Sequence, residues 1–411
     1  MKKRVSIPVL LLAIAISAVV TFQCTFLAVS SSYEEELRSI ALATRGYYKL
    51  DEIREIVGQE YLFAEEVDEG ELEDFLSMMY LYYYVNDTYA AYYNPVETEK
   101  MLYESGGNFV GIGVHVTYSE EDDTIEILLP MENSPAKEAG LEPGDKIIAV
   151  EGELISELGY ETAVERVRGE AGTTVTLTVS RLNVDGTVTV FDVTVARAAV
   201  KNQTVLYSRA EADPSIAIIR IIQFDAGTPD QFAEALAQMK ADGIGKVIFD
   251  VRGNPGGQVS SVVSVLDQLI GKGIITTFRD THGNVIKTHK ATSPDALNIP
   301  MVVLADENTA SAGELFTCSL MDYDLATMIG TKTFGKGVGQ SPFMLADGSC
   351  IYITALYYDP PKSENYHGVG ITPDLTVELP EQYRQINVMK IPQSEDTQLA
   401  AAIATLNGEQ E

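Results

Sequence analysis

The sequence is poor in the residues that build metal sites and disulfide frameworks. It has 411 residues but no tryptophan, only three cysteines and only four histidines. Cys24 lies in an apolar run, which leaves Cys318 and Cys350 as one pair, and one pair cannot form a disulfide framework or a zinc site. The histidines include no pair at the helical spacing of an HExxH motif. We therefore expect no metal site and no cofactor.

Basic residues are also scarce. The sequence has 29 lysines and arginines against 60 aspartates and glutamates, which gives a net charge of -31. A surface this acidic repels nucleic-acid phosphates and anionic lipid headgroups, so we exclude nucleic acid as a partner. The composition is otherwise that of a globular protein, with 45% apolar and 22% charged residues. At roughly 150 residues per domain, the length predicts two or three domains.

A single long hydrophobic run is present, and it lies at the N-terminus. Basic residues at positions 2–4 precede a largely apolar segment over residues 5–29. This run is long enough to span a bilayer, and its basic flank predicts export of the residues that follow. We therefore expect residues 1–30 to form a single-pass membrane anchor with an extracytoplasmic body. Ala28-Val29-Ser30 also suits signal cleavage, which leaves a secreted form open.

Sequence patterns divide the rest of the chain into four parts. Residues 31–105 have a helical apolar period and many tyrosines, which predicts a helical region that packs on a neighbouring domain or subunit. Residues 106–198 carry short β-patterned runs, whereas residues 199–378 alternate strands with helices, as in an α/β sheet. Residues 379–411 form a tail with a predicted docking helix. The expected strands are 113–118, 124–129, 146–150, 174–181, 188–195, 216–222, 246–251, 301–304 and 326–330, and the expected helices are 135–139, 159–167, 229–241, 258–270, 311–323 and 394–406.

The second of these parts contains a long motif. The stretch from Ser134 to Gly152, with Pro143-Gly144-Asp145 at its turn, resembles the core of a PDZ domain. Upstream, Gly111-Ile112-Gly113-Val114 is similar to the carboxylate-binding loop of that family. Glycines let successive backbone N–H groups converge on an anion, and a peptide C-terminus can then add as a strand beside the loop. The resemblance implies binding of free peptide C-termini.

Three segments of the third part carry residues suited to chemistry. Asp250–Gly257 follows a strand and precedes a helix, which fits either an oxyanion-binding loop or a plain turn. Ser311 begins a helix, where a serine is ordinarily an N-cap. Residues 330–340 contain the pattern G-x-x-x-x-G-K of a phosphate-binding loop. Gly337 stands where the magnesium-ligating Ser or Thr belongs, and the residues after it read as strand and turn, so we exclude nucleotide binding.

Together, the order and spacing of these segments resemble the C-terminal processing peptidases of family S41, over residues 33–375. The stretch Asn86-Asp87-Thr88-Tyr89 is also similar to that family. The resemblance implies a multidomain α+β fold: a PDZ domain inserted before an α/β ClpP/crotonase-like serine protease core, with an N-terminal helical arm. It implies Ser311 as nucleophile, Lys336 as general base and Gln340 as the residue that orients the lysine. The implied oxyanion hole is the backbone N–H of Gly256 or Gly257 together with that of Ala312.

Two positions need separate comment. Gly313 stands where the family usually has serine, but it is not expected to touch the nucleophile. Asp322 has a family counterpart once suspected of catalysis, and we interpret it as a structural helix-end aspartate.

A lysine base must be neutral to accept a proton from serine. Its ordinary pKa of about 10.4 has to fall by about three units, which corresponds to roughly 4 kcal/mol and which burial can supply. Lys336 precedes a segment, residues 337–345, that contains no charge, so the sequence predicts such burial.

We therefore expect a membrane-anchored extracytoplasmic serine endopeptidase that acts on proteins or peptides with free C-termini and associates as a homodimer. A non-enzymatic PDZ adaptor on an inactive core and an acyl hydrolase are the alternatives. Arg168 follows the second PDZ helix and is either an interdomain sensor of bound peptide or a solvated arginine. The physiological substrate and the direction of PDZ control stay open.

Overall fold

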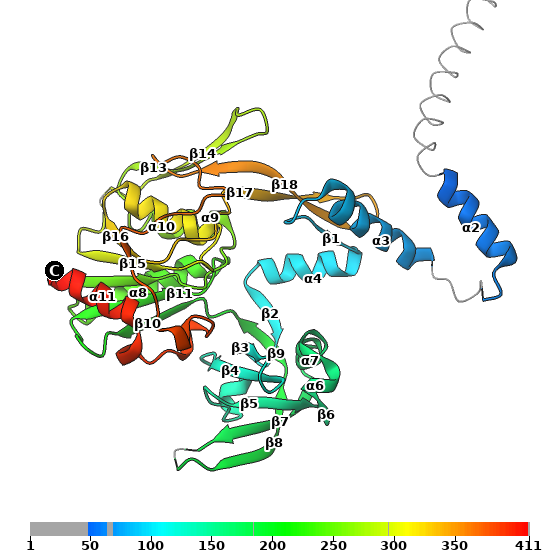
Figure 1. Cartoon of the computed structure of the whole chain (residues 1–411), viewed down its shortest axis with the longest axis horizontal. Coiled ribbons are helices and arrows are strands. Elements are labelled where there is room, and N and C mark those ends of the chain that lie inside the picture. The colour runs from blue at the N-terminus through cyan, green and yellow to red at the C-terminus, as the bar shows by residue number, and fades with distance from the viewer. Residues whose placement is uncertain (1–47, 64–68, 184, 295, 410–411) are drawn as a thin grey trace, which may run out of the picture. The chain divides into compact units, whose positions relative to one another are not determined.

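The computed structural model describes residues 48–409 except 64–68, 184 and 295 (Figure 1). The chain divides into a unit of residues 1–76 and a compact unit of residues 77–411. Helix α2 (Tyr48–Glu60) belongs to the first, and α3 (Glu69–Met79) crosses the division. No helix within the described ranges is long and apolar enough to cross a membrane. The predicted anchor at residues 1–30 lies outside those ranges.

The PDZ-like module is an antiparallel sheet with short helices. Its strands are ordered β3-β4-β5-β7-β8, with β6 beside β5, and its core is aliphatic, with Ile127, Leu177 and Val179 fully buried. Ser134 caps α5 by accepting a hydrogen bond from the Lys137 N–H (3.2 Å). The elements are β2 (Asn108–Gly111), β3 (Val114–Ser119), β4 (Thr124–Pro130), α5 (Pro135–Glu138), β5 (Lys146–Val150), β6 (Glu153–Leu154), α6 (Ile155–Leu158), α7 (Tyr160–Val167), β7 (Thr174–Leu182), β8 (Val188–Ala196) and β9 (Ala198–Lys201).

The second module is built on a six-stranded sheet ordered β10-β11-β12-β15-β16-β19. Only β10 runs antiparallel to its neighbour. Side chains alternate between the two faces of a strand, so Ile219 and Phe249 join the core beneath α8, α9 and α10, whereas Ile218 and Ile248 pack with α11. The elements are β10 (Val205–Arg209), β11 (Ile216–Ile221), α8 (Thr228–Ala241), β12 (Lys246–Asp250), α9 (Val259–Leu266), β15 (Met301–Ala305), α10 (Ala312–Asp322), β16 (Ala326–Gly330), β19 (Leu375–Thr376) and α11 (Thr397–Asn407). The helix expected over residues 394–406 is present as α11, which begins at Thr397 and packs Leu399 and Ala402 against the sheet.

A second sheet differs from the sequence prediction. It has the order β1-β18-β13-β14, with β17 also paired to β18, and consists of β1 (Ala91–Tyr93), β13 (Gly273–Arg279), β14 (Val285–Ala291), β17 (Val338–Met344) and β18 (Cys350–Asp359). The helical prediction for residues 31–105 is therefore wrong at β1. Residues 91–93 pair with β18, from Ala91 opposite Tyr352 to Tyr93 opposite Cys350, and this contact is more than 250 residues distant in sequence.

The N-terminal helical region is divided, and helix ends differ from the prediction. Residues Tyr80–Val85 form a π-helix, and α4 (Pro95–Ser105) begins a separate helix capped by Asn94, whose side chain accepts from Glu97 N–H. Helix α9 ends at Leu266, four residues before the predicted end. Local patterns do not fix such ends, because they depend on the elements packed beside them.

Candidate active site

Ser311 occupies a strained turn at the start of α10. It is the N-cap residue, it is buried, and its backbone has φ 55° and ψ −117°. A positive φ is uncommon for a residue with a side chain and marks turns whose strain serves a function. The Ala310 N–H donates to the Asn254 carbonyl (2.9 Å). This hydrogen bond connects the turn to the predicted oxyanion-binding segment Asp250–Gly257, which we call the glycine loop. The structure thus presents the predicted nucleophile beside the predicted oxyanion loop.

Glycine is required at position 256 of that loop. A Cβ added there would lie 2.6 Å from Ser311 Cβ and 2.9 Å from Ala312 N, and Gly256 has φ +104°. In this arrangement the Gly256 N–H donates to Asn254 Oδ1 (2.8 Å) and is therefore already occupied. The Gly257 N–H makes no hydrogen bond to a described residue, and Ala312 opens α10, where backbone N–H groups lack helical partners. Of the predicted donors, Gly257 and Ala312 are those available for an oxyanion.

The glycine loop is held from behind by a buried charge network. Arg252 is 4% exposed and pairs with Asp250 (2.7 Å) and with Asp396 (2.8 Å), and it also donates to Gln398 (3.0 Å) at the start of α11. Burial opposes ionisation of Asp250, but the charges of Arg220 and Arg252 outweigh it and hold the pKa of Asp250 at about 2. Helix α11 thereby fixes the loop that follows β12.

Glu314 joins the serine turn to the lysine segment, and sequence reasoning did not single it out. Its fully buried carboxylate accepts four hydrogen bonds: from Ser311 N (2.9 Å) and Lys336 N (2.7 Å) on Oε2, and from Gly335 N (2.7 Å) and Thr333 Oγ1 (2.6 Å) on Oε1. Two distant segments are thus fixed by one side chain. The available signal was an acid three residues after an N-cap serine, which is the spacing of a capping box.

Lys336 is half-buried, and its backbone is linked to the serine turn through Glu314 and Tyr358. Its Nζ lies 4.3 Å from the centre of the Tyr89 ring, a cation–π contact. Burial lowers the pKa of Lys336, as the sequence predicted, whereas the charge of Asp87 acts in the opposite direction. Among the described residues, Lys336 Nζ makes no hydrogen bond to Ser311 Oγ, so the base has to turn away from Tyr89 to reach the nucleophile.

Tyr358 is a further residue of the site that the sequence did not indicate. Its hydroxyl is hydrogen-bonded to Ser311 Oγ (3.1 Å) and donates to the carbonyl of Lys336. The side chain is fully buried, and burial raises the pKa of Tyr358 well above its ordinary value, so the phenol is neutral. Tyr358 therefore holds the serine hydroxyl and the lysine backbone in one place.

Gln340 lies on β17 with its amide turned to Thr354 of β18. Its Nε2 donates to Thr354 Oγ1 (3.0 Å), and no hydrogen bond to Lys336 is present among the described residues. Asp322, by contrast, accepts hydrogen bonds from the backbone N–H of Lys362 (2.8 Å) and Ser363 (3.0 Å). This contact fits the interpretation of Asp322 as a structural helix-end residue.

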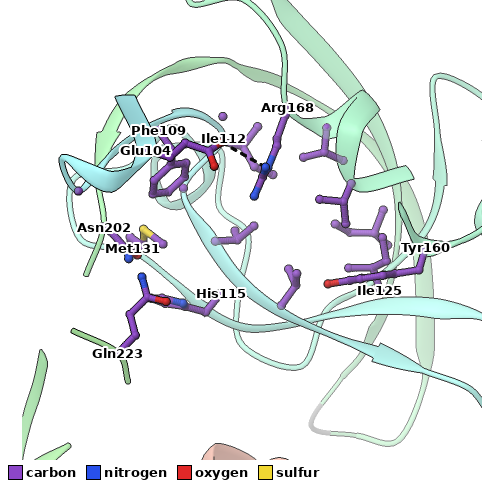
Figure 2. Close-up of a pocket in the computed structure, with 18 residues that line it drawn as sticks. Glu104, Phe109, Ile112, His115, Ile125, Met131, Tyr160, Arg168, Asn202 and Gln223 are labelled. Atoms are coloured by element: carbon purple, nitrogen blue, oxygen red, sulfur yellow. Dashed lines mark hydrogen bonds and ion pairs between the residues drawn. The ribbon is translucent and has the colours of Figure 1, made fainter. Parts of the chain in front are cut away.

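A groove of about 410 Å³ opens in the PDZ-like module. Its wall includes the predicted loop residues Gly111, Ile112, Gly113 and Val114, together with apolar side chains of β4, β5 and α7. Figure 2 shows Arg168 at this groove, joined to Glu104 of α4 by an ion pair of 3.3 Å. The structure thus brings the predicted peptide-binding loop and the predicted sensor together.

His115 and Cys318 have no catalytic surroundings. His115 Nε2 is hydrogen-bonded to the Gln203 carbonyl (2.8 Å), and burial raises the pKa of the Cys318 thiol to about 12. The described part of the chain contains no cluster of His, Cys, Asp and Glu able to hold a metal ion.

Comparison with known proteins shows where this architecture recurs. The model of peptidase family S41 matches residues 215–377, and that of the PDZ domain matches residues 100–180. The chain is 33% identical over 317 residues to a CtpA-like serine protease of Staphylococcus saprophyticus, covering 77% of this chain and 62% of the relative. It is also 33% identical over 309 residues to the carboxy-terminal-processing protease of Bartonella bacilliformis, covering 74% of this chain and 69% of the relative.

A solved Bacteroides fragilis structure assigned to the S41 proteases shares the fold. It has a TM-score of 0.58 at 18% identity and covers 87% of this chain and 97% of that one. The chain spans less than two thirds of the staphylococcal relative's length. The predicted domain boundaries stay predictions, but the order of a PDZ domain before a peptidase domain is confirmed. Because the Bartonella relative is 33% identical and covered over 69% of its length, and because the S41 and PDZ models both match, the chain belongs to the S41 carboxy-terminal-processing serine proteases.

Proposed function

We propose that the protein is a serine endopeptidase in which Ser311 is the nucleophile and Lys336 the general base. One observation carries the proposal: the Glu314 carboxylate binds the backbone N–H of both residues, at 2.9 and 2.7 Å, and so fixes the nucleophile beside the base. A serine hydroxyl needs an adjacent base to attack a carbonyl, and among the described residues no histidine is hydrogen-bonded to Ser311 Oγ.

The reaction follows from these positions. Neutral Lys336 Nζ takes the proton of Ser311 while Oγ attacks the scissile carbonyl, and the resulting oxyanion is stabilised by the N–H groups of Gly257 and Ala312. The Lys336 ammonium then gives its proton to the leaving amine as the C–N bond breaks. Water, deprotonated by the same lysine, releases the acyl group and restores Ser311.

The PDZ groove is proposed to bind substrate or activator C-termini and to report binding through Arg168. In the described structure, Arg168 is paired with Glu104 on α4, and the next residue of α4, Ser105, accepts a hydrogen bond from the Gln258 side chain beside the oxyanion loop. A peptide carboxylate competes with Glu104 for Arg168, which alters the contact that reaches Gln258. We propose that this is how the groove and the catalytic site communicate.

Residues 1–30 are proposed to anchor the protein in a membrane with its body extracytoplasmic, from the apolar run at residues 5–29 and its basic flank. A homodimer is proposed from the helical arm, which exposes aromatic side chains at Tyr82, Tyr83 and Tyr84. No cofactor enters the proposed chemistry.

Cleavage of β-casein by the full chain tests the activity. Ser311→Ala and Lys336→Ala should each abolish cleavage, because one removes the nucleophile and the other the base. Lys332→Ala is the matched control, since Lys332 is an exposed lysine of the same segment and should leave cleavage unchanged. Cleavage that survives either catalytic substitution would refute the proposal. Retained peptide binding with no cleavage by the parent chain would favour the adaptor.

A further inference from the structure

The Gln340 side chain is held by a relay that ends at a carboxylate from a distant segment. Gln340 Nε2 donates to Thr354 Oγ1 (3.0 Å), and Thr354 in turn donates to Asp87 through its hydroxyl (3.0 Å, to Oδ1) and its backbone N–H (2.8 Å, to Oδ2). The three residues come from β17, β18 and the segment after the π-helix, and each is partly buried.

The carboxylate fixes the direction of every bond in this relay. Burial opposes ionisation of Asp87, but hydrogen bonds from the backbone N–H groups of Thr354 and Tyr89 lower the pKa of Asp87 below its ordinary value. An ionised carboxylate can only accept, so the one hydroxyl proton of Thr354 is committed to Asp87. Thr354 Oγ1 can therefore only accept from Gln340, and the NH₂ end of that amide has to face it.

From this geometry we propose that Asp87 is a positioning residue of the catalytic site: through Thr354 it orients the Gln340 amide so that Oε1 is the atom presented to Lys336. The proposal deepens the proposed Ser–Lys mechanism and rests on it. Gln340 Oε1 accepts no hydrogen bond from a described residue in the present arrangement, so it is available to the lysine ammonium that forms during the reaction.

The chemistry explains why a neutral side chain suits position 340. A carboxylate next to Lys336 would favour the charged ammonium and oppose its action as a base. An amide oxygen orients the ammonium without adding a full negative charge. The relay from Asp87 holds the NH₂ group on Thr354 and so leaves the oxygen as the end that can meet the lysine, since an amide has two nearly isosteric orientations.

The relay predicts an unusual interaction between two substitutions. In Gln340→Glu, a carboxylate faces the lone pairs of Thr354 Oγ1, because the Thr354 proton is committed to Asp87. In Asp87→Asn, the Thr354 hydroxyl no longer has to donate its proton to residue 87, so the Gln340 amide can reverse. In the double variant, the Thr354 hydroxyl is able to donate to the new carboxylate at position 340, so each change compensates for the other.

The test measures kcat and KM for fluorescently labelled β-casein with the full chain, together with urea unfolding midpoints. At a pH on the alkaline plateau of the profile, where Lys336 is neutral in every variant, we expect Asp87→Asn and Gln340→Glu each to lower kcat on the order of tenfold with KM little changed, since about 1.4 kcal/mol of misorientation corresponds to that factor. The double variant should recover to within about threefold of the parent chain. Its unfolding midpoint should likewise exceed the value expected from adding the two single changes.

Thr354→Val is the control that separates the relay from simple repulsion between two carboxylates. It removes only the Thr354 hydroxyl that links the two side chains. When Asp87→Asn and Gln340→Glu are made singly and together in Thr354→Val, the compensation between them should therefore disappear. Compensation that persists there, or additive losses in the parent background, would overturn the proposal. Compensation in the unfolding midpoints but not in kcat would overturn the catalytic role.

Ser311→Ala and Lys336→Ala keep this test distinct from that of the proposed function. If either retains cleavage, the Ser–Lys mechanism fails whatever the relay does. If both abolish cleavage and the double variant shows no recovery, the relay fails while the mechanism stands.

Discussion

Glu314→Gln tests the hydrogen bonds by which the Glu314 carboxylate connects the serine turn to the lysine segment. Each carboxylate oxygen accepts two hydrogen bonds, one set from Ser311 and Lys336 and the other from Gly335 and Thr333. An amide has to turn its NH₂ group toward one of these sets. The Thr333 side is the less costly choice, because a hydroxyl can rotate and accept, but the Gly335 N–H then loses its acceptor.

A buried donor without a partner costs about 1–3 kcal/mol, so we expect Glu314→Gln to lower the free energy of unfolding by that amount. Activity should fall further, on the order of a hundredfold, because a small displacement between nucleophile and base is costly to the reaction. Urea unfolding and casein cleavage measure the two effects. Glu314→Ala removes all four acceptors and should destabilise the fold by more than about 4 kcal/mol.

Glu307→Gln is the matched control, because Glu307 is an exposed carboxylate that accepts a hydrogen bond from Thr331. It should change neither stability nor activity by much. A Glu314→Gln protein with unchanged stability and full activity would refute the idea that this carboxylate fixes the site.

Three other predictions follow from single contacts. Gly256→Ala should abolish cleavage, because its Cβ would lie 2.6 Å from Ser311 Cβ and its φ is +104°, and casein cleavage by folded protein checks this. The value of kcat/KM should rise with pH as Lys336 loses its proton, at a pH below the ordinary lysine pKa of 10.5. Asp87→Asn should move that rise to lower pH, because the Asp87 charge raises the pKa of Lys336. Folding lowers the pKa of Asp250 from 3.8 to about 2. Above its ordinary pKa, this carboxylate therefore stabilises the fold by roughly 2 kcal/mol, and the contribution is lost as the pH falls toward 2. Acid unfolding that Asp250→Asn leaves unchanged would contradict this.

The sequence indicated the residues whose neighbours along the chain reveal them. Ser311 at a predicted helix start, Lys336 before an uncharged segment and the PDZ loop at residues 111–114 all lie in short motifs with recognisable spacing. The strand alternation after residue 199 was sufficient to predict β11, β12, β15 and β16 of the central sheet, because buried parallel strands have a strong apolar pattern, but not the edge strands β10 and β19.

The rest depends on contacts between distant segments. Glu314 has the sequence spacing of an ordinary capping residue, and only the tertiary structure brings the lysine segment onto its carboxylate. Tyr358 and Thr354 lie on β18, which the sequence did not predict, and their partners at Ser311 and Asp87 are 47 and 267 residues away. The strand at residues 91–93 forms only by pairing with that same β18. Local propensity contains no signal for such pairings.

Labelling with a fluorophosphonate probe, followed by peptide mapping, tests the central claim most directly. The probe reacts with an activated serine, so the full chain should be labelled at Ser311, and Lys336→Ala should abolish labelling whereas Lys332→Ala should not. Labelling of a different serine, or labelling of Ser311 that is unchanged in Lys336→Ala, would contradict the Ser–Lys mechanism.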